Sequence, residues 1–248
     1  MKAIFFKPNN LKFILRIFFQ SILDKILKRD EISQSVKSYI FKNAKQNDPE
    51  SILRAMDDFA KNNRFLMNIG DEKGLLLTEE LKKLGRNILI LELGCFCGYS
   101  AILMARNLGN AGKVVSLEVN RTYAKNASEI INFAGLRDKI TIIEGSSDKI
   151  ISTLRYKFDL VLLDHWKNLY KRDLIAIEKR GLLKNGSIIF ADNVGKLISA
   201  LVGKRGESDN YLDYVRNNKK YKNKNIKTFL EYSKAEDEVE ISTYSLDY

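Results

Sequence analysis

The segment LLDHWKNLY, residues 162–170, contains both the only histidine and the only tryptophan of the chain. The two stand side by side between Asp164 and Lys167. A carboxylate offers hard oxygen donors for a cation, whereas Lys167 taken alone is interpreted as an ordinary surface lysine. The alternative for Trp166 is a core residue placed for packing. The segment therefore predicts a reaction site, provided that the fold brings other polar side chains to it.

Oxygen-bearing side chains end two of the expected strands. The apolar run 158–164 ends at Asp164, and the run 186–193 ends at Asp192 and Asn193. Neighbouring parallel strands lie ~4.8 Å apart, so the three side chains would converge if the two strands are adjacent. Each residue alone could instead cap a following helix. Together they favour a Mg²⁺ site, because Mg²⁺ prefers oxygen ligands and keeps open positions for water or substrate.

A glycine-bearing turn follows an earlier strand, in ELGCFCGYS, residues 92–100. Gly94 and Gly98 allow a tight turn and close approach of a ligand to the start of the next helix. Glu118 ends the following strand about 24 residues later, where an acidic residue commonly binds a ribose diol. An ordinary tight turn and a solvated glutamate are the alternative. The pair indicates a cofactor that contains adenosine.

The elements that position these residues alternate along the chain. Helical periodicity runs through 33–44 and, after Pro49, through 50–62. Apolar strands then alternate with helices, and Asn120 is expected to cap one of them. Near-continuous apolar strands separated by helices predict an α/β fold whose parallel sheet is covered on both faces. The expected strands are 87–94, 113–120, 139–145, 158–164 and 186–193.

The C-terminal part departs from this alternation. Residues 226–234 and 239–246 read as two strands joined by the acidic AEDE, which predicts an antiparallel hairpin. The basic segment RNNKKYKNKNIK, residues 216–227, is expected to be a solvated loop.

Composition limits the function classes. With 248 residues, 45% of them hydrophobic, the chain can bury one sizeable core. Two cysteines and one histidine are too few for a disulfide framework or an ordinary zinc site, which favours a reducing, cytoplasmic compartment. The formal charge of +11 comes largely from lysines scattered among asparagines, without an arginine-rich stripe. We interpret it as a basic surface and expect no nucleic-acid partner.

The N-terminal segment 11–28 is an apolar helix with one narrow polar stripe. Its longest uncharged run, 17–23, is far shorter than the ~18–20 residues of a membrane span. Three alternatives remain open: a helix in the plane of a membrane surface, a helix packed on the domain, and a transit peptide. We expect residues 1–30 to be an amphipathic extension that contacts membranes and is dispensable for activity, and residues 31–248 to form the catalytic domain. The stripe consists of Lys12, Arg16, Gln20, Asp24 and Lys28.

Five segments carry a family resemblance. They are MNIGDEKG (67–74), ELGCFCGYS (92–100), LDHWKNLY (163–170), ADNV (191–194) and FLEY (229–232). The five segments occur in the order of the catechol O-methyltransferase family and at nearly the same spacing. Residues 31–248 therefore resemble that family. The resemblance implies a Rossmann-like class I methyltransferase with a mostly parallel seven-stranded sheet, a C-terminal antiparallel hairpin and helices on both faces. It also implies a monomer that moves a methyl group from S-adenosylmethionine to one hydroxyl of a Mg²⁺-chelated catechol.

The resemblance also assigns roles by position. Lys167 matches the general base and Glu231 the residue that holds the second hydroxyl. The implied metal ligands are Asp164, Asp192 and Asn193. The implied cofactor contacts are Met67, Asn68, Ile69, Glu92, Gly94, Tyr99, Ser100, Glu118, Val119, Ser147, Asp148, Asp164, His165 and Trp166. The implied substrate contacts are Phe65, Asp164, Trp166, Lys167, Asn193 and Glu231. Asp148 stands where the family usually has glutamine.

Other departures from the family pattern concentrate at the substrate wall. Phe65 replaces a tryptophan, and the proline expected shortly after ADNV is missing. Segment 195–210 is longer than its counterpart. Catechol chemistry is therefore better supported than any particular acceptor, and a different vicinal-diol phenol stays open. So does a catalytically weak, membrane-associated scaffold of the same family, although every candidate ligand and Lys167 are retained.

Overall fold

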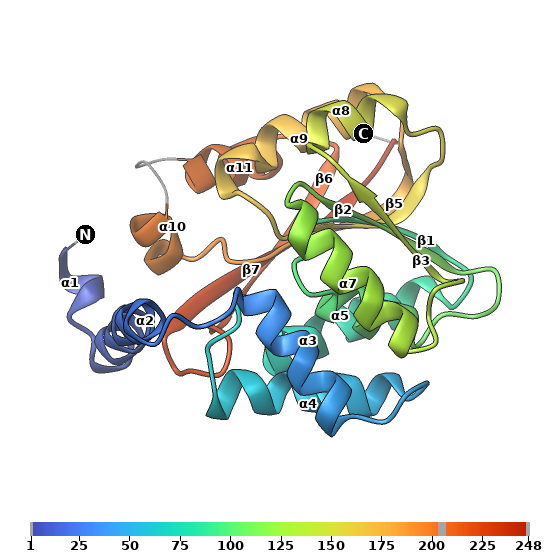
Figure 1. Ribbon diagram of the computed structural model, residues 1–248. Helices are drawn as coiled ribbons and strands as arrows, with labels where there is room; N and C mark the ends of the chain where they lie inside the picture. Colours follow the sequence, from blue (N-terminus) through green and yellow to red (C-terminus); the bar gives the residue numbers. More distant parts are fainter. Residues whose placement is uncertain (1, 203–206, 247–248) are drawn as a thin grey trace.

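A single mixed sheet of seven strands, in the order β3-β2-β1-β4-β5-β7-β6, organises the computed structural model, which describes residues 2–202 and 207–246 (Figure 1). The first five strands are parallel, and β7 is antiparallel to both β5 and β6. The strands are β1 (Leu89–Leu93), β2 (Lys113–Glu118), β3 (Ile140–Glu144), β4 (Phe158–Leu163), β5 (Leu183–Ala191), β6 (Tyr221–Phe229) and β7 (Glu236–Tyr244). The expected α/β fold with its C-terminal hairpin is confirmed.

The register of β4 and β5 decides where the candidate ligands lie. The two strands are adjacent and parallel, with Leu163 opposite Ala191. Asp164 and Asp192 each follow directly, so they leave the sheet at the same edge. Asp164 and Asp192 therefore converge at one edge of the sheet, as the proposed metal site requires.

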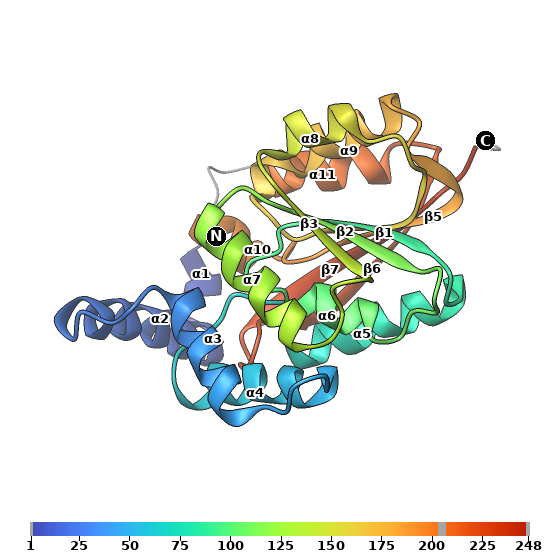
Figure 2. The ribbon, with the colours of Figure 1, turned by 45° about the vertical axis from the view of Figure 1, so that its right-hand side comes forward.

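Helices cover both faces of the sheet (Figures 1 and 2). One core lies between the sheet and α3 to α7, and a second lies between the sheet and α8, α9 and α11. The helices on the first face are α3 (Ile32–Asn43), α4 (Pro49–Asn62), α5 (Gly70–Leu84), α6 (Tyr99–Ala105) and α7 (Arg121–Phe133). Those on the second are α8 (Ser147–Thr153), α9 (Tyr170–Lys179), which follows the 3₁₀ turn η1 (Lys167–Leu169), and α11 (Glu207–Arg216).

The expected N-cap of one helix is confirmed, and a second helix begins at a similar cap. The Asn120 side chain accepts the N–H groups of Thr122 and Tyr123 at 2.9 and 3.2 Å, as expected of an N-cap. Asp48 caps α4 in the same way, by accepting the N–H of Ser51 at 2.9 Å. The Asn120 cap fixes where the loop after β2 enters α7, whereas Asp48 caps a helix that precedes the strands.

The prediction of a solvated loop at 216–227 is wrong. Residues 221–229 form β6, the outermost strand of the sheet, and Lys222, Lys224 and Lys227 are exposed on it. Lysines are common on edge strands because they discourage pairing with another chain, and this makes such a strand resemble a loop in sequence. The turn of the hairpin also lies earlier than AEDE, since β7 already begins at Glu236.

The N-terminal helices α1 (Lys2–Phe5) and α2 (Pro8–Ile26) lie beside α10 (Lys196–Val202) (Figure 1). Arg16 donates to the carbonyl of Ala60 at 2.6 Å, and Asp24 pairs with Arg64 at 2.9 Å. The polar stripe of α2 thus faces the domain, which is the packed-helix alternative. Large apolar side chains are exposed instead, namely Leu11, Leu15, Phe18, Phe19, Ile22, Leu23 and Ile26. Across residues 2–202 and 207–246, no helix combines the length and apolarity needed to cross a bilayer.

Candidate active site

The turn after β1 requires glycine at position 94. Gly94 has φ +103°, and a Cβ added there would lie 2.1 Å from the carbonyl oxygen of Asp164. Any side chain would therefore separate the loop after β1 from the loop after β4. Close approach of these two backbones brings the glycine turn and the LDHWK segment to one place.

Glu118 is held in a fixed orientation at the end of β2. Its Oε2 accepts the N–H of Phe96, and its Oε1 accepts the N–H of Asn120, each at 2.8 Å. Phe96 has a positive φ of 48°, a conformation that residues other than glycine rarely adopt. A carboxylate fixed in this way has lone pairs left to accept hydrogen bonds from a diol.

A cavity of about 970 Å³ opens at this edge of the sheet. Its volume lies at the upper end of the range for small-molecule sites, which suits a cofactor together with a small acceptor. The candidate residues that line it are Phe65, Met67, Asn68, Gly94, Tyr99, Ser100, Glu118, Val119, Ser147, Asp148, Asp164, His165, Trp166, Lys167, Asn193 and Glu231. Ile69, Glu92 and Asp192 do not line it.

Several features of the lining indicate that a ligand belongs there. Met67, Val119 and Trp166 are 69%, 60% and 63% exposed, although each is a large apolar side chain. Both polar side-chain atoms of Asn68 are buried without a hydrogen-bond partner in the described chain. The exposure of Trp166 also rules out the interpretation of that residue as a core packing residue.

His165 anchors the loop after β4. Its Nε2 lies 2.8 Å from Oδ2 of the buried Asp173, which also accepts the hydroxyl of Ser147 at 2.6 Å. The imidazole stacks on the ring of Tyr170 at 5.1 Å. Burial lowers the pKa of His165, although Asp173 opposes this, so the ring is neutral near pH 7. Its role in the described structure is to connect the loop to α9 and to the start of α8.

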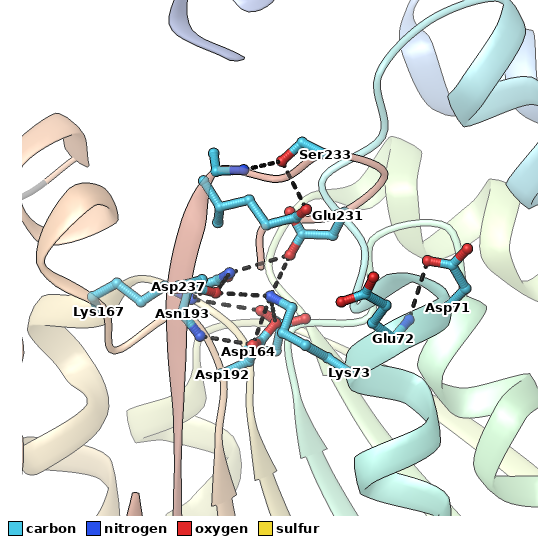
Figure 3. Close-up of polar contacts among 12 residues, drawn as sticks. Asp71, Glu72, Lys73, Asp164, Lys167, Asp192, Asn193, Glu231, Ser233 and Asp237 are labelled. Carbon is cyan, nitrogen blue, oxygen red and sulfur yellow. Dashed lines mark hydrogen bonds and ion pairs between the residues drawn. The ribbon is translucent and has the colours of Figure 1, made fainter. Parts of the chain in front are cut away.

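Lys73, on α5, lies at the centre of a buried cluster of carboxylates (Figure 3). Its Nζ is 2.7 Å from Asp192, 2.5 Å from Glu231 and 3.0 Å from Asp237. Burial opposes a charge on Lys73, but the attraction of the three carboxylates outweighs it and holds its pKa well above the ordinary value. Asp192 faces this ammonium group, which explains its absence from the cavity wall.

Sequence reasoning missed Lys73 and Asp237. Lys73 lies within MNIGDEKG, among charged residues that resemble the solvated start of a helix. Asp237 lies in the acidic AEDE, which suggested only a turn. The available signal was the lysine inside a motif already singled out for its resemblance to the family.

Lys167 lies on the other side of Asn193 from this buried cluster (Figure 3). Its Nζ donates to Tyr170 Oη at 2.7 Å and to Asn193 Oδ1 at 3.1 Å, and lies 3.5 Å from Asp164 Oδ1. The Asn193 amide nitrogen donates to Glu231 at 3.1 Å and to Asp237 at 2.9 Å. Asn193 therefore connects the lysine that lines the cavity to the buried carboxylates.

The site carries more negative than positive charge. Four carboxylates, those of Asp164, Asp192, Glu231 and Asp237, face the two ammonium groups of Lys73 and Lys167, which leaves a formal charge of −2. Burial raises the pKa of Asp164 despite the opposing attraction of Lys167 and Lys73. Burial also raises the pKa of Asp192 well above its ordinary value, with Lys73 opposing and the other carboxylates adding to it.

The donor set fits a hard dication, although no cluster of three or more His, Cys, Asp or Glu side chains in the described ranges has the arrangement of a preformed metal centre. The three expected ligands do not form such a cluster, because only two of them are carboxylates and the third is the amide of Asn193. The oxygens of Asp164 and Asn193 already meet at one cation, the ammonium group of Lys167. A dication would balance the formal charge of −2.

Comparisons with known proteins agree with this geometry. A family model described as O-methyltransferase matches residues 43–245. The chain is 38% identical over 223 residues to catechol O-methyltransferase B of Danio rerio, covering 88% of this chain and 81% of that protein. It is 34% identical over 232 residues to catechol O-methyltransferase of Mus musculus, covering 92% and 84%.

Solved structures share the fold. An O-methyltransferase from Bacillus cereus in complex with SAH has a TM-score of 0.65 at 20% identity, covering 93% of this chain and 99% of that chain. One from Streptomyces achromogenes in complex with SAM has the same TM-score and identity, covering 93% and 97%. With the family match over most of its length and relatives above 30% identity, this chain belongs to the O-methyltransferase family, among the catechol O-methyltransferases.

Proposed function

We propose that this chain transfers a methyl group from S-adenosylmethionine to one hydroxyl of a catechol. The observation that carries the proposal is that one cavity is lined both by the cofactor-type residues Gly94 and Glu118 and by Lys167, beside oxygens that suit a cation. The named relatives are catechol O-methyltransferases, and two structural relatives are complexes with SAM or SAH. These findings support the cofactor and the acceptor class together.

Asp164, Asp192 and Asn193 are the residues that would hold Mg²⁺. When bound, the ion would supply Lewis-acid stabilisation of the catecholate and a template for its two oxygens. Asp192 faces Lys73 in the described structure, so Lys73 would hold that carboxylate in place. The excess of negative charge supports binding of a dication.

Lys167 is the proposed general base. Its Nζ lines the cavity, and its hydrogen bonds to Tyr170 and Asn193 fix its position beside the proposed ligands. In its neutral form the amine can accept the proton of the hydroxyl that is methylated. Glu231 also lines the cavity and would accept a hydrogen bond from the second hydroxyl.

The direct test measures label transfer from methyl-labelled S-adenosylmethionine. We expect catechol to be converted to its monomethyl ether, with activity lost in EDTA and restored by Mg²⁺. Resorcinol is the matched control, because its two hydroxyls are not vicinal and cannot chelate one ion. Equal labelling of the two phenols, or full activity without a divalent metal, would remove the chelation mechanism.

We also propose that the outward face of α2 contacts a membrane surface, with the domain on the cytosolic side. Seven large apolar side chains are exposed along it, from Leu11 to Ile26, and Lys25 and Lys28 lie at its C-terminal end. Apolar area and basic residues together favour anionic lipid surfaces. The chain should float with anionic liposomes, and Phe19→Asp should reduce this several-fold. Flotation unaffected by that change would contradict the role of α2.

A further inference from the structure

Helix α2 supplies part of the wall of the active-site cavity. Phe13, Ile14, Ile17, Phe18 and Ser21 of this helix line the cavity that also contains Lys167 and Glu231. Apart from Phe18, which is also one of the exposed apolar side chains, these positions lie between the polar stripe that contacts the domain and the exposed apolar face. The N-terminal segment is therefore more than an appendage, because three different faces of one helix contact the domain, the cavity and the exterior.

Contacts with Phe65 fix the position of α2. Phe65 is the residue that replaces a tryptophan of the family pattern in the substrate wall. Gln20 Oε1 accepts the N–H of Phe65 at 2.7 Å, and Gln20 Nε2 donates to its carbonyl at 3.4 Å. The Phe13 ring meets the Phe65 ring edge-on, with centroids 5.2 Å apart. Phe13 and Phe65 belong to a separate small core with Leu197, Leu230 and Ala235. This core joins α2 to α10 and to the hairpin turn.

The wall formed in this way is apolar. Apart from Ser21, the lining residues from α2, together with Phe65 and with Ile198 and Leu201 of α10, are hydrocarbon or aromatic. Asp24 is the only acidic residue of α2, and it pairs with Arg64. No acidic side chain from α2 or α10 lines this wall in the described chain. A cationic substituent placed there would lose water without gaining a partner, which is costly.

We propose that α2 determines acceptor specificity, with Ile14 and Ile17 selecting catechols that carry an apolar substituent over catechols that carry an ammonium group. The inference rests on the proposed catechol methylation and adds the class of acceptor. Phe13 lines both this cavity and a neighbouring one, and Glu231 does the same, which places the α2 wall beside the residue that would hold the second hydroxyl. A substituent on the ring of a catechol held by Glu231 can therefore reach α2.

The test compares kcat/KM for catechol, 4-butylcatechol and 4-(2-aminoethyl)catechol on the full-length chain. Each buried methylene contributes a factor of about four, so the butyl compound should exceed the aminoethyl compound by at least about 10-fold. Ile17→Ala should reduce this preference about 5-fold. Ile17→Asp should shift the preference toward the amine.

Leu15→Ala is the matched control, because Leu15 is an aliphatic residue of the same helix that is 43% exposed and outside the cavity lining. It should leave the butyl-to-aminoethyl ratio unchanged. If thermal melting shows that Ile17→Asp is not folded, the Ile14→Ala and Ile17→Ala variants are used for the test instead. A ratio near one in the unmodified chain, or one that Ile17→Ala and Leu15→Ala change equally, overturns the specificity role. Failure to methylate unsubstituted catechol would instead overturn the proposed function.

Discussion

Replacing Lys73 by methionine should strongly destabilise the fold. Lys73 is 1% exposed and is the shared ion-pair partner of Asp192, Glu231 and Asp237. Removing one member of a buried ion pair typically costs ~3–5 kcal/mol, because the remaining charges stay buried without compensation. For a domain of this size, ~1 kcal/mol corresponds to about 2–4 °C in Tm, so the Tm should fall by about 6–20 °C.

Urea unfolding followed by circular dichroism measures the effect, with Lys82→Met as the matched control. Lys82 is on the same helix, but its side chain is 66% exposed and its ion pair with Glu79 lies at the surface. Exposed pairs contribute ~0–1 kcal/mol. A Lys73→Met variant whose free energy of unfolding falls no further than that of Lys82→Met would show that the buried cluster is not held together as we describe.

The pH dependence of the variant gives a second readout. Burial already raises the pKa of Asp192, and loss of the opposing ammonium group should raise it further. The folded variant then binds more protons than its unfolded chain, so its stability should fall as pH rises. The deficit relative to the unmodified chain should therefore be smaller at pH 5 than at pH 8. A deficit that grows on acidification would contradict this electrostatic account.

Two further predictions concern Lys167 and Glu92. Lys167→Met should lower kcat by ~10² to 10⁴, with the affinity for S-adenosylmethionine nearly unchanged. Lys179→Met is the control, because Lys179 is exposed, and it should lower neither quantity. Equal losses in binding and rate for Lys167→Met would argue against a general base. Burial raises the pKa of Glu92 from 4.5 to about 7, so the folded state holds a proton that the unfolded chain releases. The free energy of unfolding should therefore decrease as the pH rises from 4.5 to about 7. Glu92→Gln should flatten that decline in pH-dependent urea unfolding, and an unchanged slope would assign it to other groups.

The sheet could be predicted because its strands carry strong local signals. Strands buried on both faces read as continuous apolar runs, and the residues that end them lie at one edge whatever the details of packing. Asp164, Asp192 and Glu118 were found in this way. Only the end of β6 was predicted as a strand, because its lysine-rich first part has the composition of a loop.

Lys73 could not be found from local patterns because its environment is entirely non-local. Its three carboxylate partners lie between 119 and 164 residues away in sequence. A charged residue on a helix is usually solvated, and only the assembled fold shows that this one is buried.

The sequence showed the amphipathic character of α2 but not its orientation. Arg16, Gln20 and Asp24 contact the domain through hydrogen bonds and an ion pair, whereas an isolated amphipathic helix would be expected to turn its polar stripe to water. The partners of this stripe are mainly backbone groups of Ala60 and Phe65, which no side-chain pattern encodes. The expectation that residues 1–30 are dispensable for activity stays a prediction, and residues of α2 line the cavity.

The most direct test of the central claim uses Trp166, the only tryptophan, whose 63% exposed indole lines the cavity. The claim is that cofactor, metal and catechol bind at this one site. Titration with S-adenosylmethionine should change the tryptophan emission saturably, and a catechol inhibitor should change it again only when Mg²⁺ is present. Emission that is indifferent to all three would contradict the claim, and a catechol response independent of Mg²⁺ would contradict chelation beside Trp166.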